Sequence, residues 1–133
     1  MGKKLALYIM PLLLSATGCN GHAGLSEPGS SGARHAAEHF YDVLARGHAG
    51  EYVDNMQEAC FMDSSKHAQF VDMMEQFLHE ERLSSGGILS ARATRDTLAD
   101  SVAMVFLDVQ FADSTCEEVM LPLVYTRGRW WIR

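Results

Sequence analysis

The spacing of apolar residues changes once along the chain, at Gly86-Gly87, and this change restricts the fold more than any other feature. Before it, residues 33–82 repeat apolar side chains at the three- and four-residue intervals typical of helices. After it, residues 88–133 alternate apolar and polar side chains, as half-buried strands do. Helices followed by strands predict an α+β fold, in which N-terminal helices pack on an antiparallel sheet of about four strands.

The helical half divides into three predicted segments. The first covers residues 33–47, with Ser30 or Ser31 placed to cap its start and Gly47 to end it. A short second helix follows around Tyr52, and the third begins after Asp63. The third helix has the clearest apolar stripe, which we expect to be buried as core; its members are Phe70, Met73, Met74, Phe77 and Leu78.

The strand half alternates most strongly at residues 101–111. We expect the apolar odd-numbered side chains to face the helices; they are Val105, Leu107, Val109 and Phe111. The opposite face is mixed, and solvent or a second copy of the chain is expected to cover it. The predicted contact residues of such a homodimer are Met104, Phe106 and, from the following strand, Met120.

The N-terminus has the layout of a secretory signal. Lys3 and Lys4 precede an apolar run over residues 5–14, which is half the length that a membrane-spanning helix needs. Residues 15–19, Ser-Ala-Thr-Gly-Cys, resemble the lipobox of bacterial lipoproteins. The resemblance implies a signal peptide over residues 1–18 and a lipid attached to Cys19; the alternative is an ordinary cleaved signal with a chance cysteine.

Charge and composition then give the expected compartment. Once residues 1–18 are removed, seventeen acidic and nine basic residues remain, a formal charge of −8 that argues against nucleic-acid binding. Residues 19–32 are rich in Gly and Ser and are predicted to be the lipidated cysteine and a flexible tether, followed by a single domain over residues 33–133. Asn20 is not the Asp of inner-membrane retention, so we expect an outer-membrane lipoprotein that faces the periplasm.

Two further cysteines, Cys60 and Cys116, would meet oxidising conditions in that compartment. A bridge between them would close a loop of roughly sixty residues and stabilise the fold by about 4 kcal/mol in the chain-entropy model. The alternative is two buried free thiols.

Two stretches resemble a known superfamily. HAAEHFYDVLARGHAGEYVDNM resembles the opening helices of nuclear-transport-factor-2-like proteins, and LPLVYTRGRWWI resembles their last hairpin. The resemblance covers roughly residues 33–133. It implies a cone in which a curved sheet wraps a long helix and leaves a pocket at the wide end, and a superfamily that includes isomerases, cyclases and many non-enzymes.

Neither the isomerase pattern nor a metal motif assigns chemistry to this chain. In the isomerase-like members that the resemblance brings in, a tyrosine lies seven residues before the glycine that ends the first helix. In this chain that position is Phe40. The next residue, Tyr41, lies about 100° farther round the helix, so we expect its side chain to point elsewhere. Asp108 lies on the strand face opposite the core. His35, Glu38 and His39 match H-x-x-E-H, which we interpret as surface side chains on a helix flank.

We therefore expect a lipid-anchored, non-catalytic binding or interaction domain, with no catalytic residue, metal site or cofactor assigned. Its partner would be a small apolar ligand in the cone or an envelope protein. The alternative is a small-molecule enzyme of the isomerase or cyclase kind, which predicts polar side chains converging inside the cone.

Overall fold

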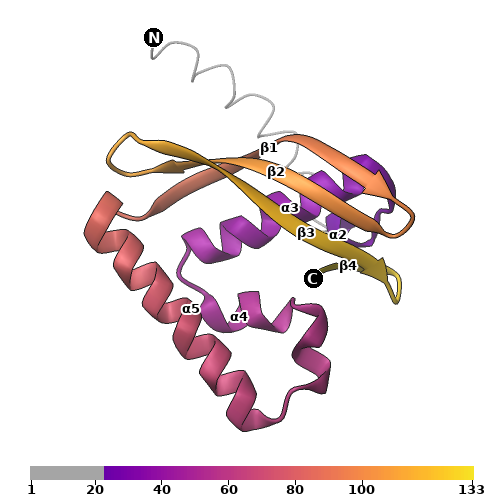
Figure 1. Cartoon of the computed structure of the whole chain (residues 1–133), viewed down its shortest axis with the longest axis horizontal. Helices are drawn as coiled ribbons and strands as arrows, with labels where there is room; N and C mark the ends of the chain where they lie inside the picture. Colours follow the sequence, from indigo (N-terminus) through magenta and orange to yellow (C-terminus); the bar gives the residue numbers. More distant parts are fainter. Residues whose placement is uncertain (1–22) are drawn as a thin grey trace.

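The computed structural model describes residues 23–133 and confirms the α+β plan (Figure 1). Helices come first along the chain and strands last, with the change at Gly86 and Gly87. The predicted signal peptide and Cys19 lie outside the described residues. The elements are α2 (Ala23–Ser26), α3 (Gly29–Ala45), α4 (Ala49–Asp54), the 3-10 helix η1 (Gln57–Phe61), α5 (Ser64–Ser85), β1 (Ile88–Ala99), β2 (Val102–Phe111), β3 (Cys116–Thr126) and β4 (Arg129–Ile132).

The four strands form one antiparallel sheet in the order β1-β2-β3-β4. Each strand therefore pairs with its neighbour in the chain. The register of β1 on β2 shifts twice, near Leu89 and near Thr94. Among residues 23–133, none of the helices combines the length and the apolar character needed to cross a bilayer.

The helix α3 runs along one face of this sheet and supplies most of the helical core (Figure 1). The odd-numbered side chains of β2 face it, as the alternation predicted. Fully buried residues on the two sides of this contact are Ala33, Ala36, Ala37 and Phe40 on α3, and Ala103, Val105 and Leu107 on β2.

The fold begins earlier than the sequence indicated, because residues 23–26 form α2 and residues 29–32 form the first turn of α3. The indole N–H of Trp130 donates a hydrogen bond to the backbone carbonyl oxygen of Glu27 at 2.8 Å. The hydroxyl of Tyr125 donates one to the backbone carbonyl oxygen of Ser26 at 2.7 Å. Leu25 is buried in the core. The prediction of a tether up to residue 32 was wrong because these partners lie about a hundred residues away in the chain and give no local signal.

The third predicted helix is confirmed as α5, but the burial of its apolar stripe is not. The Asp63 side chain accepts from the backbone N–H of Lys66 at 2.8 Å, and Gly86 ends the helix in the left-handed conformation. Of its residues only Leu78 is buried, while Met73 is 62% exposed and Phe77 37%. The cause is position: α5 packs chiefly on α4 and diverges from the sheet (Figure 1).

The structure does not contain the predicted disulfide bridge. Cys60 Sγ lies 3.2 Å from the guanidinium of Arg127 in the β3–β4 turn, whereas Cys116 is the first residue of β3. A strand rises about 3.3 Å per residue, so the length of β3 places the two thiols on the order of 30 Å apart. Bridged Cα atoms lie within about 7 Å of one another. Both thiols are exposed, which also corrects the alternative of two buried thiols.

The packing of α2 can be tested with two leucines. We expect Leu25→Ala, at a buried side chain, to lower the free energy of unfolding of the domain by about 2 kcal/mol in urea denaturation. The control, Leu83→Ala, removes the same atoms from a side chain that is 75% exposed, and should change it by less than about 0.5 kcal/mol. Equal effects would contradict a folded α2.

Candidate functional site

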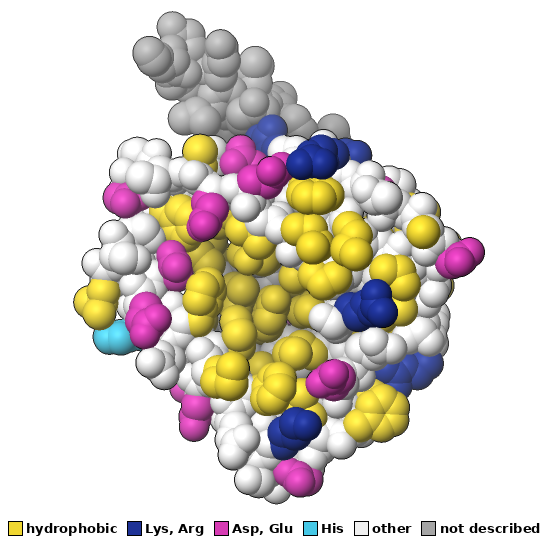
Figure 2. Space-filling view, in the orientation of Figure 1, with side chains coloured by type: hydrophobic (Ala, Val, Ile, Leu, Met, Phe, Trp, Pro, Cys, Tyr) yellow, Lys and Arg dark blue, Asp and Glu magenta, His cyan; other side chains and the backbone are white. Residues whose placement is uncertain are grey.

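A cleft of about 240 Å³ opens between α3, α5 and the sheet, at the end where β1 starts and β2 finishes. Figure 2 shows apolar side chains gathered in the hollow between α5 and the sheet, with acidic side chains on the α5 side and both acidic and basic side chains elsewhere around them. The floor and walls of the cleft are mostly apolar, with three polar exceptions. The lining residues are Tyr41, Phe77, Glu81, Ile88, Val109, Phe111, Glu117 and Val119.

Tyr41 lines this cleft, so the expectation that it would point elsewhere was wrong. Phe40 is fully buried against the sheet, and Tyr41, one residue on, turns toward α5 instead. Because α5 diverges from the sheet, that side of α3 borders an opening. Burial, and then the negative charges of Glu117 and Glu81, raise the pKa of Tyr41 above its ordinary value. The phenol is therefore protonated at neutral pH and can donate a hydrogen bond.

The two carboxylates of the cleft come from elements that the chain keeps far apart. Glu81 lies four residues before the end of α5, and Glu117 is the second residue of β3, opposite Val109. Sequence reasoning missed both, since each is one acid among many in a chain with seventeen. Two carboxylates and a protonated phenol on an apolar floor form a site that attracts a cationic group with an apolar neighbour.

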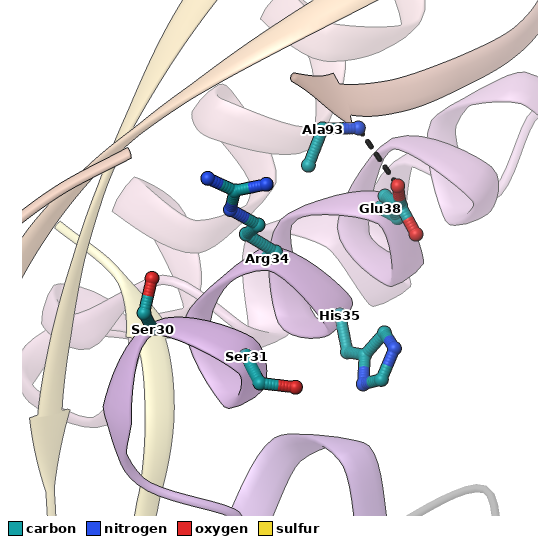
Figure 3. A pocket seen from close by; sticks show the side chains of 6 residues that line it. All are labelled: Ser30, Ser31, Arg34, His35, Glu38 and Ala93. Carbon is teal, nitrogen blue, oxygen red and sulfur yellow. Dashed lines mark hydrogen bonds between the residues drawn. The ribbon is translucent and has the colours of Figure 1, made fainter. Parts of the chain in front are cut away.

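A larger, polar depression of about 460 Å³ lies between α3 and β1 (Figure 3). Its charged groups already have partners in the protein. Glu38 accepts a hydrogen bond from the backbone N–H of Ala93 at 2.7 Å, where the register shift of β1 takes that N–H out of the ladder. Arg34 and Ser30 both bind Asp96, at 2.5 and 2.6 Å. These hydrogen bonds and the ion pair hold α3 against β1. The polar groups of the depression are therefore occupied within the protein, which makes it a weaker candidate site than the cleft.

The residues of the H-x-x-E-H motif make separate contacts. Glu38 accepts the hydrogen bond from the Ala93 N–H, and His35 lines the polar depression beside α3 (Figure 3). His39 makes an edge contact with the ring of Phe40. Within residues 23–133, no group of three or more His, Cys, Asp or Glu side chains is arranged to hold a metal ion.

Comparison with known proteins addresses the fold. No protein-family model and no curated protein sequence matches the chain. Among solved structures, the crystal structure of an NTF2-like transpeptidase from Campylobacter jejuni matches with a TM-score of 0.60 and 15% sequence identity, covering 73% of this chain and 93% of the other. The chain has a nuclear-transport-factor-2-like fold. At this identity the likeness concerns the fold alone.

In this nuclear-transport-factor-2-like fold, the outer face of the sheet holds the residues predicted for a homodimer. Phe106 stands opposite Met120 in the β2–β3 register, and Met104 stands opposite Pro122. Met104 and Met120 are exposed, while the guanidinium of Arg95 lies 3.8 Å from the ring centroid of Phe106. The side chains form one patch, and the second copy that would cover it stays a prediction.

Asp108 also lies on the outer face, as its position in the alternation predicted. It stands opposite Arg92 on one side and Glu118 on the other. The sheet itself separates it from the cleft, so Asp108 has no part in the candidate site.

The contacts of Asp96 between α3 and β1 predict that the stability of the fold depends on pH. Burial opposes ionisation of Asp96, but the hydrogen bonds from Ser30 and Arg34 and the charge of Arg34 outweigh it and lower the pKa of Asp96. The folded state thus binds this proton less readily than the unfolded state. The stabilisation that ionised Asp96 gives the folded state is complete above the pKa of about 4 that an Asp has in the unfolded chain. It is lost as the pH falls through the lower pKa that Asp96 has in the folded state.

We expect Asp96→Asn to lower the free energy of unfolding at pH 7 by about 1 kcal/mol, a modest value because Arg34 is partly exposed. The variant should also lose less stability than the wild type on acidification. Urea denaturation across the acidic range measures both effects, with the exposed Asp72→Asn as control. A wild-type pH profile in Asp96→Asn would contradict this role of the carboxyl.

Proposed function

We propose that this chain is a lipid-anchored protein of the bacterial cell envelope whose cleft is a non-catalytic binding site for a cationic, partly apolar segment of another envelope protein. The observation that supports the binding site is the position of Glu81 and Glu117 beside an apolar floor. A Lys or Arg side chain can meet such carboxylates while its methylene stem and an apolar neighbour cover the floor.

The size of the cleft favours a protein segment over a free small molecule. Its volume of about 240 Å³ is below the range of about 300–1,000 Å³ typical of small-molecule pockets. It has room for one or two side chains. The apolar surface also extends from Phe77 to Met73, one turn earlier on α5, so a longer partner would find further contacts outside the cleft.

The charge of the cleft argues against the alternative of an isomerase- or cyclase-type enzyme. Such enzymes stabilise negative charge that develops on oxygen by placing hydrogen-bond donors around it. Tyr41 is a donor, but Glu81 and Glu117 beside it would repel an oxyanion. The Campylobacter structure is described as a transpeptidase, so peptide chemistry is the enzymatic alternative to test. Cleavage or cross-linking of a bound peptide would favour it.

The anchor is supported by the sequence alone. The basic start, the short apolar run and the small residues before Cys19 follow the order of a lipoprotein signal. Two or three acyl chains on Cys19 would hold the protein on a membrane, which we propose is the outer membrane on its periplasmic side.

The anchor is tested by expressing the full chain and its Cys19→Ser variant in a bacterium. The wild type should partition into the detergent phase, and mass spectrometry should find diacylglycerol on Cys19. The variant should remain in the aqueous phase, and Cys60→Ser should behave as the wild type does. An unmodified full-length chain in the cytosol would overturn the proposal.

The cleft is tested with a labelled peptide of alternating Lys and Phe and its counterpart with Glu in place of Lys. We expect only the Lys peptide to bind. Two exposed ion pairs contribute about 0.5–1 kcal/mol each, so Glu81→Gln/Glu117→Gln should weaken binding roughly ten-fold in fluorescence anisotropy. The control Glu58→Gln/Glu75→Gln has the same change in net charge at exposed positions that do not line the cleft. Equal losses in both double variants would contradict the site.

A further inference from the structure

The described fold begins very close to the proposed anchor. Ala23, the first residue of α2, is only four positions after Cys19. Consecutive Cα atoms are about 3.8 Å apart, so the two residues are at most about 15 Å from one another. A tether reaching residue 32 would have allowed the domain to move freely over the membrane, but residues 29–32 are the first turn of α3.

The start of the fold lies at one end of the sheet. The backbone carbonyls of Ser26, at the end of α2, and of Glu27 accept hydrogen bonds from Tyr125 and Trp130, on either side of the β3–β4 turn. The N–H of Tyr125 also donates to the carbonyl oxygen of Ser101 in the β1–β2 turn, at 2.7 Å. We call this end, formed by α2 and these two turns, the anchor end. In Figure 1 it is the right-hand side of the molecule.

The cleft lies at the opposite end of the sheet. Glu117 and Val119, which line it, are among the first residues of β3, whereas Tyr125 is next to its last. At about 3.3 Å per residue, the eight positions from Glu117 to Tyr125 place the two ends roughly 26 Å apart along β3.

From this arrangement we infer that the domain stands on the bilayer with its anchor end against the lipid headgroups and its cleft directed away from the membrane. The inference rests on the proposed attachment of lipid at Cys19. The short connection supports it, because it holds the anchor end within about 15 Å of the lipid, while the cleft end, roughly 26 Å away along β3, has no such restraint.

The side chains at the anchor end suit a headgroup surface. Arg127 is exposed in the β3–β4 turn, with its guanidinium 4.5 Å from the ring centroid of Trp131. Phe61, in η1 next to the Arg127 partner Cys60, is largely exposed. Cationic and aromatic side chains of this kind are favoured at membrane interfaces. Glu27 and Asp100 lie at the same end, so charge alone would not orient the domain.

The orientation decides where the ligand must come from. A cleft held away from the membrane does not meet the acyl chains of its own bilayer. It meets molecules that cross the space beyond the membrane surface, so the basic, apolar segment of the proposed function would belong to a partner in the periplasm.

The two exposed native cysteines are ready-made reporters for this inference, since Cys60 contacts Arg127 at the anchor end and Cys116 starts β3 at the cleft end. The lipidated protein would be labelled with a fluorophore at Cys60 in a Cys116→Ser variant, and at Cys116 in a Cys60→Ser variant. Each would be reconstituted in vesicles of phosphatidylethanolamine and phosphatidylglycerol that contain a headgroup nitroxide lipid. We expect several-fold stronger quenching at Cys60 than at Cys116.

A matched control lengthens the segment between Cys19 and α2. Twelve Gly and Ser residues inserted after Asn20 should reduce the difference between the two labels while leaving the fold and the anchor unchanged. With the connecting segment at its native length, equal quenching of the two labels, or stronger quenching at Cys116, would overturn the orientation. A protein that carries no lipid and does not bind the vesicles would instead overturn the anchoring and, with it, the orientation.

Discussion

The inner face of the four-stranded sheet has room for one long helix, and α3 occupies it. Its small residues, Ala33, Ala36 and Ala37, allow the backbone to approach the odd-numbered side chains of β2 closely, and Phe40 fills the remaining space. Because α3 takes this place, α5 must lie outside it, with its apolar stripe half covered. The cleft is the direct consequence: α5 meets the sheet near its own C-terminal end and then diverges from it, which leaves an opening beside α3, β1 and β2.

The two ends of the domain therefore differ in structure and in chemistry. At one end, side chains of Trp130 and Tyr125 donate hydrogen bonds to the backbone at and just after the end of α2. At the other, Tyr41, Glu81 and Glu117 border an apolar opening. A closed end near the anchor and an open end with acidic groups suit a module that is held by one side and binds by the other.

Much of the fold could be predicted from local patterns. The change of spacing at Gly86 and Gly87, the cap at Asp63 and the inward odd-numbered face of β2 all depend on residues within a few positions of one another. The nuclear-transport-factor-2-like fold could also be recognised, since its opening helices and last hairpin are continuous stretches of sequence. Residues 23–32 could not, because Leu25 is their one large apolar side chain and their polar partners lie in the last hairpin.

The candidate site depended still more on distant contacts. From residue 33 onward, the sequence by itself determined which segments are helices and strands, and which face of β2 is apolar, because these properties follow from the periodicity of neighbouring side chains. Only the tertiary structure decided that Tyr41 lines the same cleft as Glu81 and Glu117, that Cys60 and Cys116 lie at opposite ends, and that the stripe of α5 stays partly exposed. The physical reason is that helical and strand periodicity specifies a face, while the angle at which whole elements pack specifies what that face meets.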